Sequence, residues 1–366
     1  MHPDLIYQLA LREVPTIGHV HAKSLIDHFG NAENIFKANA KQLLEADGIN
    51  ATNAKNIRQF RDFKQAEDEI KFIQKYKIKT ISMNDVEYPD QLLNCYDPPI
   101  LLFYRGNTDL RHTRMISIIG TRSNTEYGRS TTEKLVEILK PYNVVIVSGL
   151  AFGIDAIAHR AAIKHEIPTV GILAHGLDTL YPPEHTSLAK SMVKNGGLLT
   201  EFKSNTKPDK HNFPSRNRIA AGLSKSTVVI ESGIKGGSLI TADLAFGYHR
   251  EVYAVPGKTT DIKSRGCNQL IKSQKATILS DPEEFPDLMG WNDQTVNRNR
   301  RLRLPFDDLT EHERILVKIL EDNKALHIDE LMFMSGLSSS VTASAVLTLE
   351  LKCVVNQLPG KRVTLS

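Results

Sequence analysis

Basic side chains surround one aromatic ring between residues 207 and 218, in the sequence KPDKHNFPSRNR. Phe213 lies among the cations, and Asp209 is the one acid of the segment. Cations can neutralise a nucleic-acid backbone, and an aromatic ring can stack on an unpaired base, so the segment favours a single-stranded nucleic acid as ligand. A solvated basic loop with Phe213 in the core explains the same residues equally well. The four cations are Lys207, Lys210, Arg216 and Arg218.

Glycine- and serine-rich turns follow apolar runs at three other places, and a helical pattern follows each turn. Glycine lets the backbone approach a phosphate closely, and the start of a helix offers unpaired N–H groups. Arg122, in the first turn, adds a planar guanidinium that suits phosphate oxygens. Together with the basic segment, the turns predict a phosphate-binding rim rather than a single pocket. The turns contain Gly120, Thr121 and Arg122, then Ser148 and Gly149, then Gly237 and Ser238.

Two patterns raise the possibility of catalysis. Ser148, Asp155 and His159 are the residue types of a hydrolytic triad, but Ser148 lacks the GxSxG turn that presents a nucleophile. We therefore interpret Asp155 as a cap or dipole partner at a helix start. The loop 174–185 contains two histidines and two acids, at a spacing that matches no metal site, so we expect a structural loop, no metal and no cofactor.

Short apolar runs alternate with amphipathic stretches between residues 115 and 280. This alternation predicts an α/β domain, an extended Rossmann-like, doubly wound and mostly parallel sheet with helices on both faces. In such sheets ligands bind beyond the carboxyl ends of the strands, where the turns above are expected to lie. The expected strands are 116–119, 144–147, 169–173, 227–230 and 252–255, and the expected helices lie near 128–140, 154–165, 185–195, 214–223 and 238–248.

Smaller modules are expected on either side of this sheet. Residues 1–80 read as short helices with glycine turns at 17–20 and 47–50, typical of a helix-hairpin-helix or SAM-like domain. Such a module can bind phosphates at its hairpins, or it can be an adaptor that packs on its neighbour. The Rossmann-like domain is assigned to 81–285, a linker with the basic run RNRRLR to 286–305, and a winged-helix-like domain to 306–366. The last region has helical patterns at 310–320, 328–334 and 338–352 and a hairpin at 354–357 and 362–365.

The composition is that of an average globular protein, with 366 residues, 41% of them hydrophobic and 24% charged. The three cysteines lie far apart in the sequence, which argues against a disulfide scaffold. The sequence shows neither a secretory signal nor an apolar run of membrane-spanning length, so we expect a cytoplasmic location. The net charge of +4 permits nucleic-acid binding without demanding it.

The motifs together resemble the DNA processing protein A family (DprA, also called Smf). The stretches that carry the resemblance run in order through the sheet domain, and the flanking modules fit the family's three-part layout. His185 and Gly236 depart from the usual residues of their motifs. The matching stretches are IIGTR (118–122), SGLAFGIDAIAH (148–159), GLDTLYP (176–182), FPSRNRIAAGLS (213–224), GGSLITA (236–242), VYAVPG (252–257) and SRGCNQLI (264–271).

The resemblance implies a single-stranded DNA-binding mediator rather than an enzyme. Such a protein protects incoming DNA during natural transformation, loads the RecA recombinase on it and acts as a homodimer, with no membrane partner. The DNA-contacting positions it implies are Gly120, Thr121, Arg122, Lys210, Phe213, Arg216, Asn217, Arg218, Gly237 and Ser238. Ser148 and Gly149, in the turn expected at the same rim, are also expected to bind the DNA.

Two other classes remain as alternatives. A nucleotide phosphoribohydrolase would use a similar sheet with a catalytic glutamate after a PGGxGT loop, whereas here Glu231 precedes the Gly236-Gly237 turn. A sequence-specific regulator would read duplex DNA through the winged helix, but the expected recognition helix 338–352 has Lys352 as its one basic residue.

Overall fold

The computed structural model describes residues 4–292 and 309–365, apart from residues 324, 353, 359 and 360. Its contacts divide the chain into two compact units, Met1–Met289 and Gly290–Ser366. The basic run at 298–303 and the greater part of the expected linker at 286–305 lie outside the described residues.

The first unit is built on a sheet of nine strands in the order β1-β2-β6-β5-β4-β3-β7-β8-β9. The strands from β6 to β9 in this order are parallel neighbours, whereas β2 is antiparallel to β6 and to β1. The expected mostly parallel sheet is confirmed, with four strands more than the apolar runs predicted. The strands are β1 (Lys79–Ser82), β2 (Leu101–Gly106), β3 (Met115–Ile119), β4 (Val145–Ser148), β5 (Thr169–Ile172), β6 (Gly196–Thr200), β7 (Ser226–Val229), β8 (Glu251–Ala254) and β9 (Thr277–Ile278).

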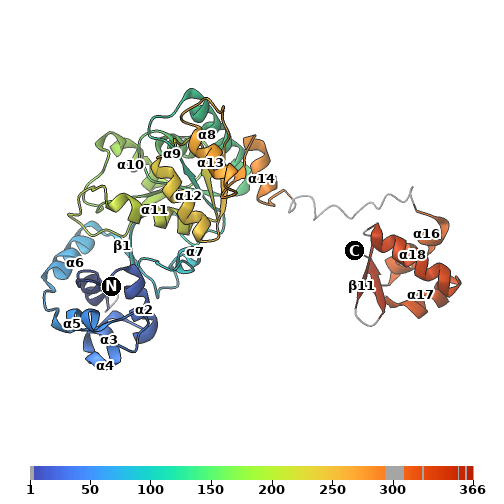
Figure 1. The fold of residues 1–366 in the computed structure, drawn as a ribbon, viewed down its shortest axis with the longest axis horizontal. Helices are drawn as coiled ribbons and strands as arrows, with labels where there is room; N and C mark the ends of the chain where they lie inside the picture. The colour runs from blue at the N-terminus through green and yellow to red at the C-terminus, as the bar shows by residue number, and fades with distance from the viewer. Residues whose placement is uncertain (1–3, 293–308, 324, 353, 359–360, 366) are drawn as a thin grey trace. The chain divides into compact units, whose positions relative to one another are not determined.

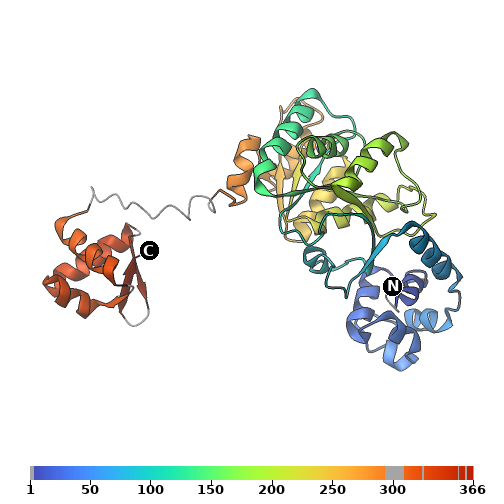
Figure 2. The same ribbon diagram turned by 180° about the vertical axis from the view of Figure 1, so that it is seen from behind.

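The strand order reverses at β3. From β3 the chain runs outward through β4, β5 and β6, and then α11 (Asn212–Leu223) returns it to β7 on the other side of β3. Helix α9 (Ile154–Lys164) packs on α8 (Glu126–Ile138) and on α10 (Thr186–Lys194), and α11 packs on α12 (Gly237–Gly247). Figures 1 and 2 view these helices from opposite sides of the sheet. A ligand site is expected at the switch point, beyond the ends of β3 and β7.

Short helices at the N-terminus pack on the same continuous apolar core as the sheet. Gly18, in an extended conformation, precedes α2, and Asn50 caps α5 by accepting the main-chain N–H groups of Thr52 and Asn53. Both expected glycine turns therefore begin helices, as the pattern predicted. The helices are α1 (Leu5–Leu11), α2 (His19–Phe29), α3 (Ala32–Lys37), α4 (Ala40–Leu43), α5 (Ala51–Gln59) and α6 (Lys64–Tyr76). Shorter or later helices of the unit are α7 (Asp90–Leu93), α13 (Arg265–Lys272) and α14 (Phe285–Leu288).

The second unit is a winged helix, as expected. Thr310 and Glu313 form a capping box at the start of its first helix, and Leu316, Leu331 and Leu349, one from each helix, are fully buried together. A three-stranded sheet in the order β10-β12-β11 supplies the wing. The elements are α16 (Glu311–Asp322), β10 (Leu326–His327), α17 (Ile328–Ser335), α18 (Ser339–Leu351), β11 (Val355–Leu358) and β12 (Arg362–Leu365).

None of the helices in the described residues is by itself long and apolar enough to cross a membrane, although α17 and α18 together, bent by 113°, pass that test of length and composition.

Candidate nucleic-acid interface

A cavity of about 350 Å³ lies at the switch point of the sheet. Its walls come from the turns after β3, β4 and β7 and from the first half of α11, so segments distant in the sequence meet there. Most of the residues expected at the rim line it. They are Gly120, Thr121, Arg122, Gly149, Lys210, Phe213, Arg216, Asn217, Gly237 and Ser238.

Neighbouring side chains pack closely on two glycines of the cavity. A Cβ atom at Gly120 would lie 2.5 Å from Cγ1 of Ile154, and one at Gly149 would lie 1.9 Å from Nη1 of Arg216. The main-chain N–H of Thr121 donates to the carbonyl of Glu231 at 2.8 Å, which joins the turns after β3 and β7. These contacts hold the turns that wall the cavity close to one another.

Phe213 lies among cations at the mouth of the cavity. Its ring centroid is 5.2 Å from the guanidinium carbon of Arg122 and 5.9 Å from that of Arg216. The ring is half-buried, Arg122 and Lys210 are exposed, and the ring of Tyr181 lies 6.4 Å away, tilted by 59°. These contacts place Phe213 in a cationic and aromatic surface rather than in the apolar core.

Tyr181 is a residue that the sequence reasoning missed. It belongs to the loop 174–185, which was interpreted as structural, yet its side chain is 43% exposed beside Phe213. Its main-chain N–H donates to Nε2 of His175 at 3.2 Å, so the buried histidine does have a structural role. An aromatic residue in a loop, in the motif Leu-Tyr-Pro, could have indicated a stacking surface. Its neighbour Phe213 is distant in the sequence, so the sequence did not show that the two rings meet.

Arg216 and Asp155 form the floor of the cavity and are 5% and 7% exposed. Nη1 of Arg216 donates to the carbonyl of Ile172 at 2.6 Å, and Asp155 accepts the main-chain N–H of Gly149 at 3.1 Å. Burial raises the pKa of Asp155, and the charge of Arg216 opposes that rise. Arg216 therefore adds positive charge beneath the cavity, partly balanced by Asp155.

The start of α12 completes the wall. Gly237 is exposed at its first turn, and Oγ of Ser238 donates to Oγ of Ser232 at 2.8 Å. Because the start of α12 lines the cavity, the positive end of its helix dipole favours an anionic group there.

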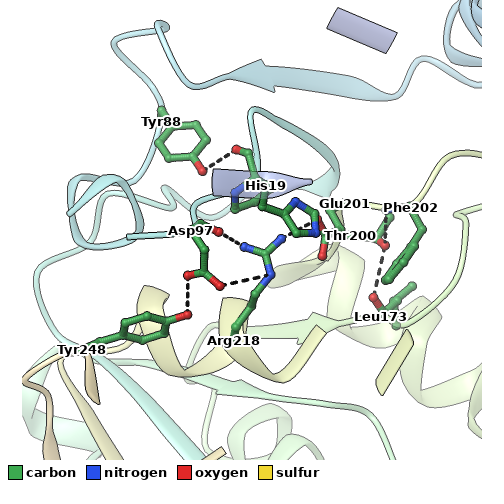
Figure 3. A network of polar contacts seen from close by, with 10 residues as sticks. His19, Tyr88, Asp97, Leu173, Thr200, Glu201, Phe202, Arg218 and Tyr248 are labelled. Carbon is green, nitrogen blue, oxygen red and sulfur yellow. Dashed lines mark hydrogen bonds and ion pairs between the residues drawn. The ribbon is translucent and has the colours of Figure 1, made fainter. Parts of the chain in front are cut away.

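Two of the expected rim residues lie elsewhere, and these expectations were wrong. Ser148 is fully buried, and its Oγ donates to the carbonyl of Ile118 at 2.7 Å. Arg218 is 5% exposed, and its Nη2 donates to Oε2 of Glu201 at 2.6 Å. Residues two apart on an α-helix point about 200° apart, so Arg218 must face away from the cavity when Arg216 faces it. Figure 3 shows Arg218 among Asp97, Glu201 and His19 instead.

The geometry does not form the suspected triad, because its histidine bonds elsewhere. Nδ1 of His159 lies 2.6 Å from Oγ1 of Thr169, whereas Asp155 interacts with the hydroxyl of Ser148 and with the main-chain N–H of Gly149. Burial lowers the pKa of His159 to about 3, so its imidazole is neutral at pH 7. Within residues 4–292 and the described part of 309–365, no three His, Cys, Asp or Glu side chains are arranged to hold a metal ion.

Glu231, the candidate acid of the hydrolase alternative, is fully buried. Its carboxylate accepts the main-chain N–H of Thr125 at 2.9 Å and the hydroxyl of the same residue. It therefore holds the start of α8, and both carboxylate oxygens are engaged by Thr125.

A doubly wound sheet with a cationic, aromatic-lined cavity at its switch point is typical of proteins that bind a phosphate-bearing ligand. The chain belongs to the DNA recombination-mediator protein A family, whose profile matches residues 79–290. Profiles for a helix-hairpin-helix motif and for the DprA winged helix domain match residues 4–70 and 303–361.

Individual relatives agree with this assignment. The chain is 31% identical to Protein Smf of Synechocystis over 97% of both proteins, and 42% identical to DNA processing protein DprA of Bacillus subtilis over 59% of this chain and 73% of that protein. The crystal structure of DprA from Streptococcus pneumoniae matches with a TM-score of 0.67 at 29% identity, over 77% of this chain and 97% of that one. A structure of DprA from Helicobacter pylori, described for its single-stranded DNA binding mode, matches with a TM-score of 0.53 at 28% identity, over 58% of this chain and 97% of that one.

Proposed function

We propose that this protein binds single-stranded DNA at the switch-point cavity and acts there as a recombination mediator without cutting the strand. The observation that carries the proposal is the half-buried ring of Phe213, which lines a glycine-walled cavity with the guanidinium carbons of Arg122 and Arg216 at 5.2 Å and 5.9 Å from its centroid. The single-stranded DNA binding described for the relative from Helicobacter pylori supports the same ligand.

Each part of the interface has a separate task. An unpaired base stacks on Phe213, and the ring of Tyr181 offers a second face for its neighbour. Arg122 and Lys210 are exposed and meet phosphates, while the start of α12 and the turn at Gly120 direct main-chain N–H groups to the backbone. In a duplex the bases are paired and stacked inside, so Phe213 has no free base face to meet. The arrangement therefore favours single strands.

We further propose that the bound strand is protected and passed to the RecA recombinase, and that the protein works as a homodimer in natural transformation. Membership of a recombination-mediator family supports this part of the proposal. Its test is RecA assembly on DNA covered with single-strand-binding protein, measured as DNA-dependent ATP hydrolysis, which this chain should accelerate.

The direct test is a binding titration with single-stranded and duplex DNA of equal length at about 50 and 200 mM salt. Preference for the single strand, without strand cleavage in a buffer that contains Mg²⁺, is expected. Equal affinity for both forms, or degradation of the DNA, would refute the proposal. Release of free base from nucleoside monophosphates would instead favour the phosphoribohydrolase alternative.

A further inference from the structure

The chain between β6 and the basic segment 207–218 is anchored on the N-terminal helices through Lys203 and Ser204. The main-chain N–H of Ser204 donates to both carboxylate oxygens of Glu69 at 3.0 Å, and its hydroxyl donates to the same carboxylate. Glu69 lies on α6 and is 5% exposed, so this contact is shielded from water. Nζ of Lys203 adds a second attachment, at 2.7 Å from Oε1 of Glu13 and 2.5 Å from Oε1 of Gln65.

The other end of the segment is anchored by Arg218 on α11. Its guanidinium donates to the carboxylate of Glu201 and to the carbonyl of Asp97. Oδ1 of Asp97 in turn accepts the hydroxyl of Tyr248 at 2.5 Å, so the anchor reaches the end of α12 (Figure 3). Residues 205–217, with Lys210 and Phe213, lie between these two anchors.

One of the two hairpins of the N-terminal module faces an internal carboxylate. Oε2 of Glu201 lies 3.5 Å from Nδ1 of His19, the first residue of α2, and Glu201 is 1% exposed. Burial lowers the pKa of His19, and the nearby carboxylate of Glu201 opposes that fall only in part, so the imidazole is mostly neutral at pH 7. Glu201 is also paired with Arg218, so the start of α2 packs on a buried ion pair that joins the helices to the sheet.

We propose that Glu69 and Arg218 are positioning residues for the single-stranded DNA interface, and that the N-terminal helical module supports segment 205–217 in its binding conformation. This inference rests on the proposed function. Neither residue lines the cavity. Their effect on binding is indirect: with both ends held, Lys210 and Phe213 lose less conformational freedom when the strand arrives.

Glu69→Ala tests the inference in the full-length chain, with Glu67→Ala, an exposed glutamate of the same helix, as the matched control. We expect Glu69→Ala to weaken single-stranded DNA binding roughly tenfold without changing the salt dependence, because no phosphate contact is removed. In the absence of DNA, amide hydrogen exchange should speed up across residues 204–213 and stay unchanged in β3 and β4. Glu69→Gln, which keeps one acceptor oxygen, should recover part of the affinity.

Ser204→Ala serves as the second variant if Glu69→Ala folds poorly, since it removes one hydroxyl contact and leaves the two main-chain bonds. If a folded Glu69→Ala protein shows unchanged hydrogen exchange and unchanged affinity for single-stranded DNA, the inference is overturned. The proposed function still stands in that case, provided that the wild-type protein binds single-stranded DNA. Wild-type protein that did not bind single-stranded DNA would overturn the proposed function. The exchange measurement would then still report whether Glu69 orders the segment.

Discussion

Replacement of Phe213 by alanine separates stacking from charge at the interface. The ring contacts Arg122, Arg216 and Tyr181 and is half-buried. Stacking of a base on an aromatic ring is worth about 1–3 kcal/mol by alanine substitution, so Phe213→Ala should weaken single-stranded DNA binding by about 5- to 150-fold. The slope of log affinity against log salt should stay nearly unchanged, because every cation remains.

The assay is a fluorescence-anisotropy titration at several salt concentrations beside a thermal melt of each variant. Phe213→Tyr keeps a ring for the base to stack on and should bind like the wild type. A half-buried ring outside the core contributes modestly to stability, so the melting temperature of Phe213→Ala should fall only slightly. A stable Phe213→Ala protein with normal affinity would remove the residue from the interface, and a severe loss of folding would show that it is a core residue.

Four further outcomes follow from the same structure. Arg122→Ala should weaken binding to any sequence and make the salt slope shallower by about 0.7, as expected for one lost phosphate contact, and an unchanged slope would contradict that role. Tyr181→Ala should weaken binding to oligonucleotides while the similarly exposed Tyr76→Ala does not, as a titration with both variants would show. Removal of residues 301–366 should leave affinity nearly intact, since Lys352 of the recognition helix pairs with Glu313 at 2.9 Å, and a large loss in the same titration would place DNA on that unit. The free energy of unfolding should fall by about 2 kcal/mol from pH 7 to pH 5 because of His159. The pKa of His159 is about 3 in the fold and about 6.5 in the unfolded chain, so the unfolded chain binds the proton first as the pH falls. Urea titrations of wild type and His159→Gln at both pH values would measure this contribution, and an equal pH dependence in both proteins would refute it.

The strands that border the cavity could be predicted because each is a short apolar run followed by a glycine turn. The runs at 116–119 and 227–230 lie within or beside β3 and β7, and the helices after them begin within two residues of the expected positions. Strand β6 was missed because its sequence, GGLLT, has too few apolar residues for the pattern. Strands β1 and β2 pair antiparallel at one edge, outside the alternation of strand and helix that revealed the others.

The residue types and their order along the chain by themselves determined the family, the winged helix and most of the cavity wall. They did so because turn glycines and strand runs are local properties, and parallel strands bring their carboxyl ends to one edge. Which cations face the cavity was decided by the tertiary structure. Arg216 and Arg218 read as equivalent in the sequence, yet the helical turn of about 200° between them sends one to the floor of the cavity and the other to Glu201 and Asp97. The pairing of Tyr181 with Phe213 and of Glu69 with Ser204 likewise joins residues far apart in the chain, and only packing could bring them together.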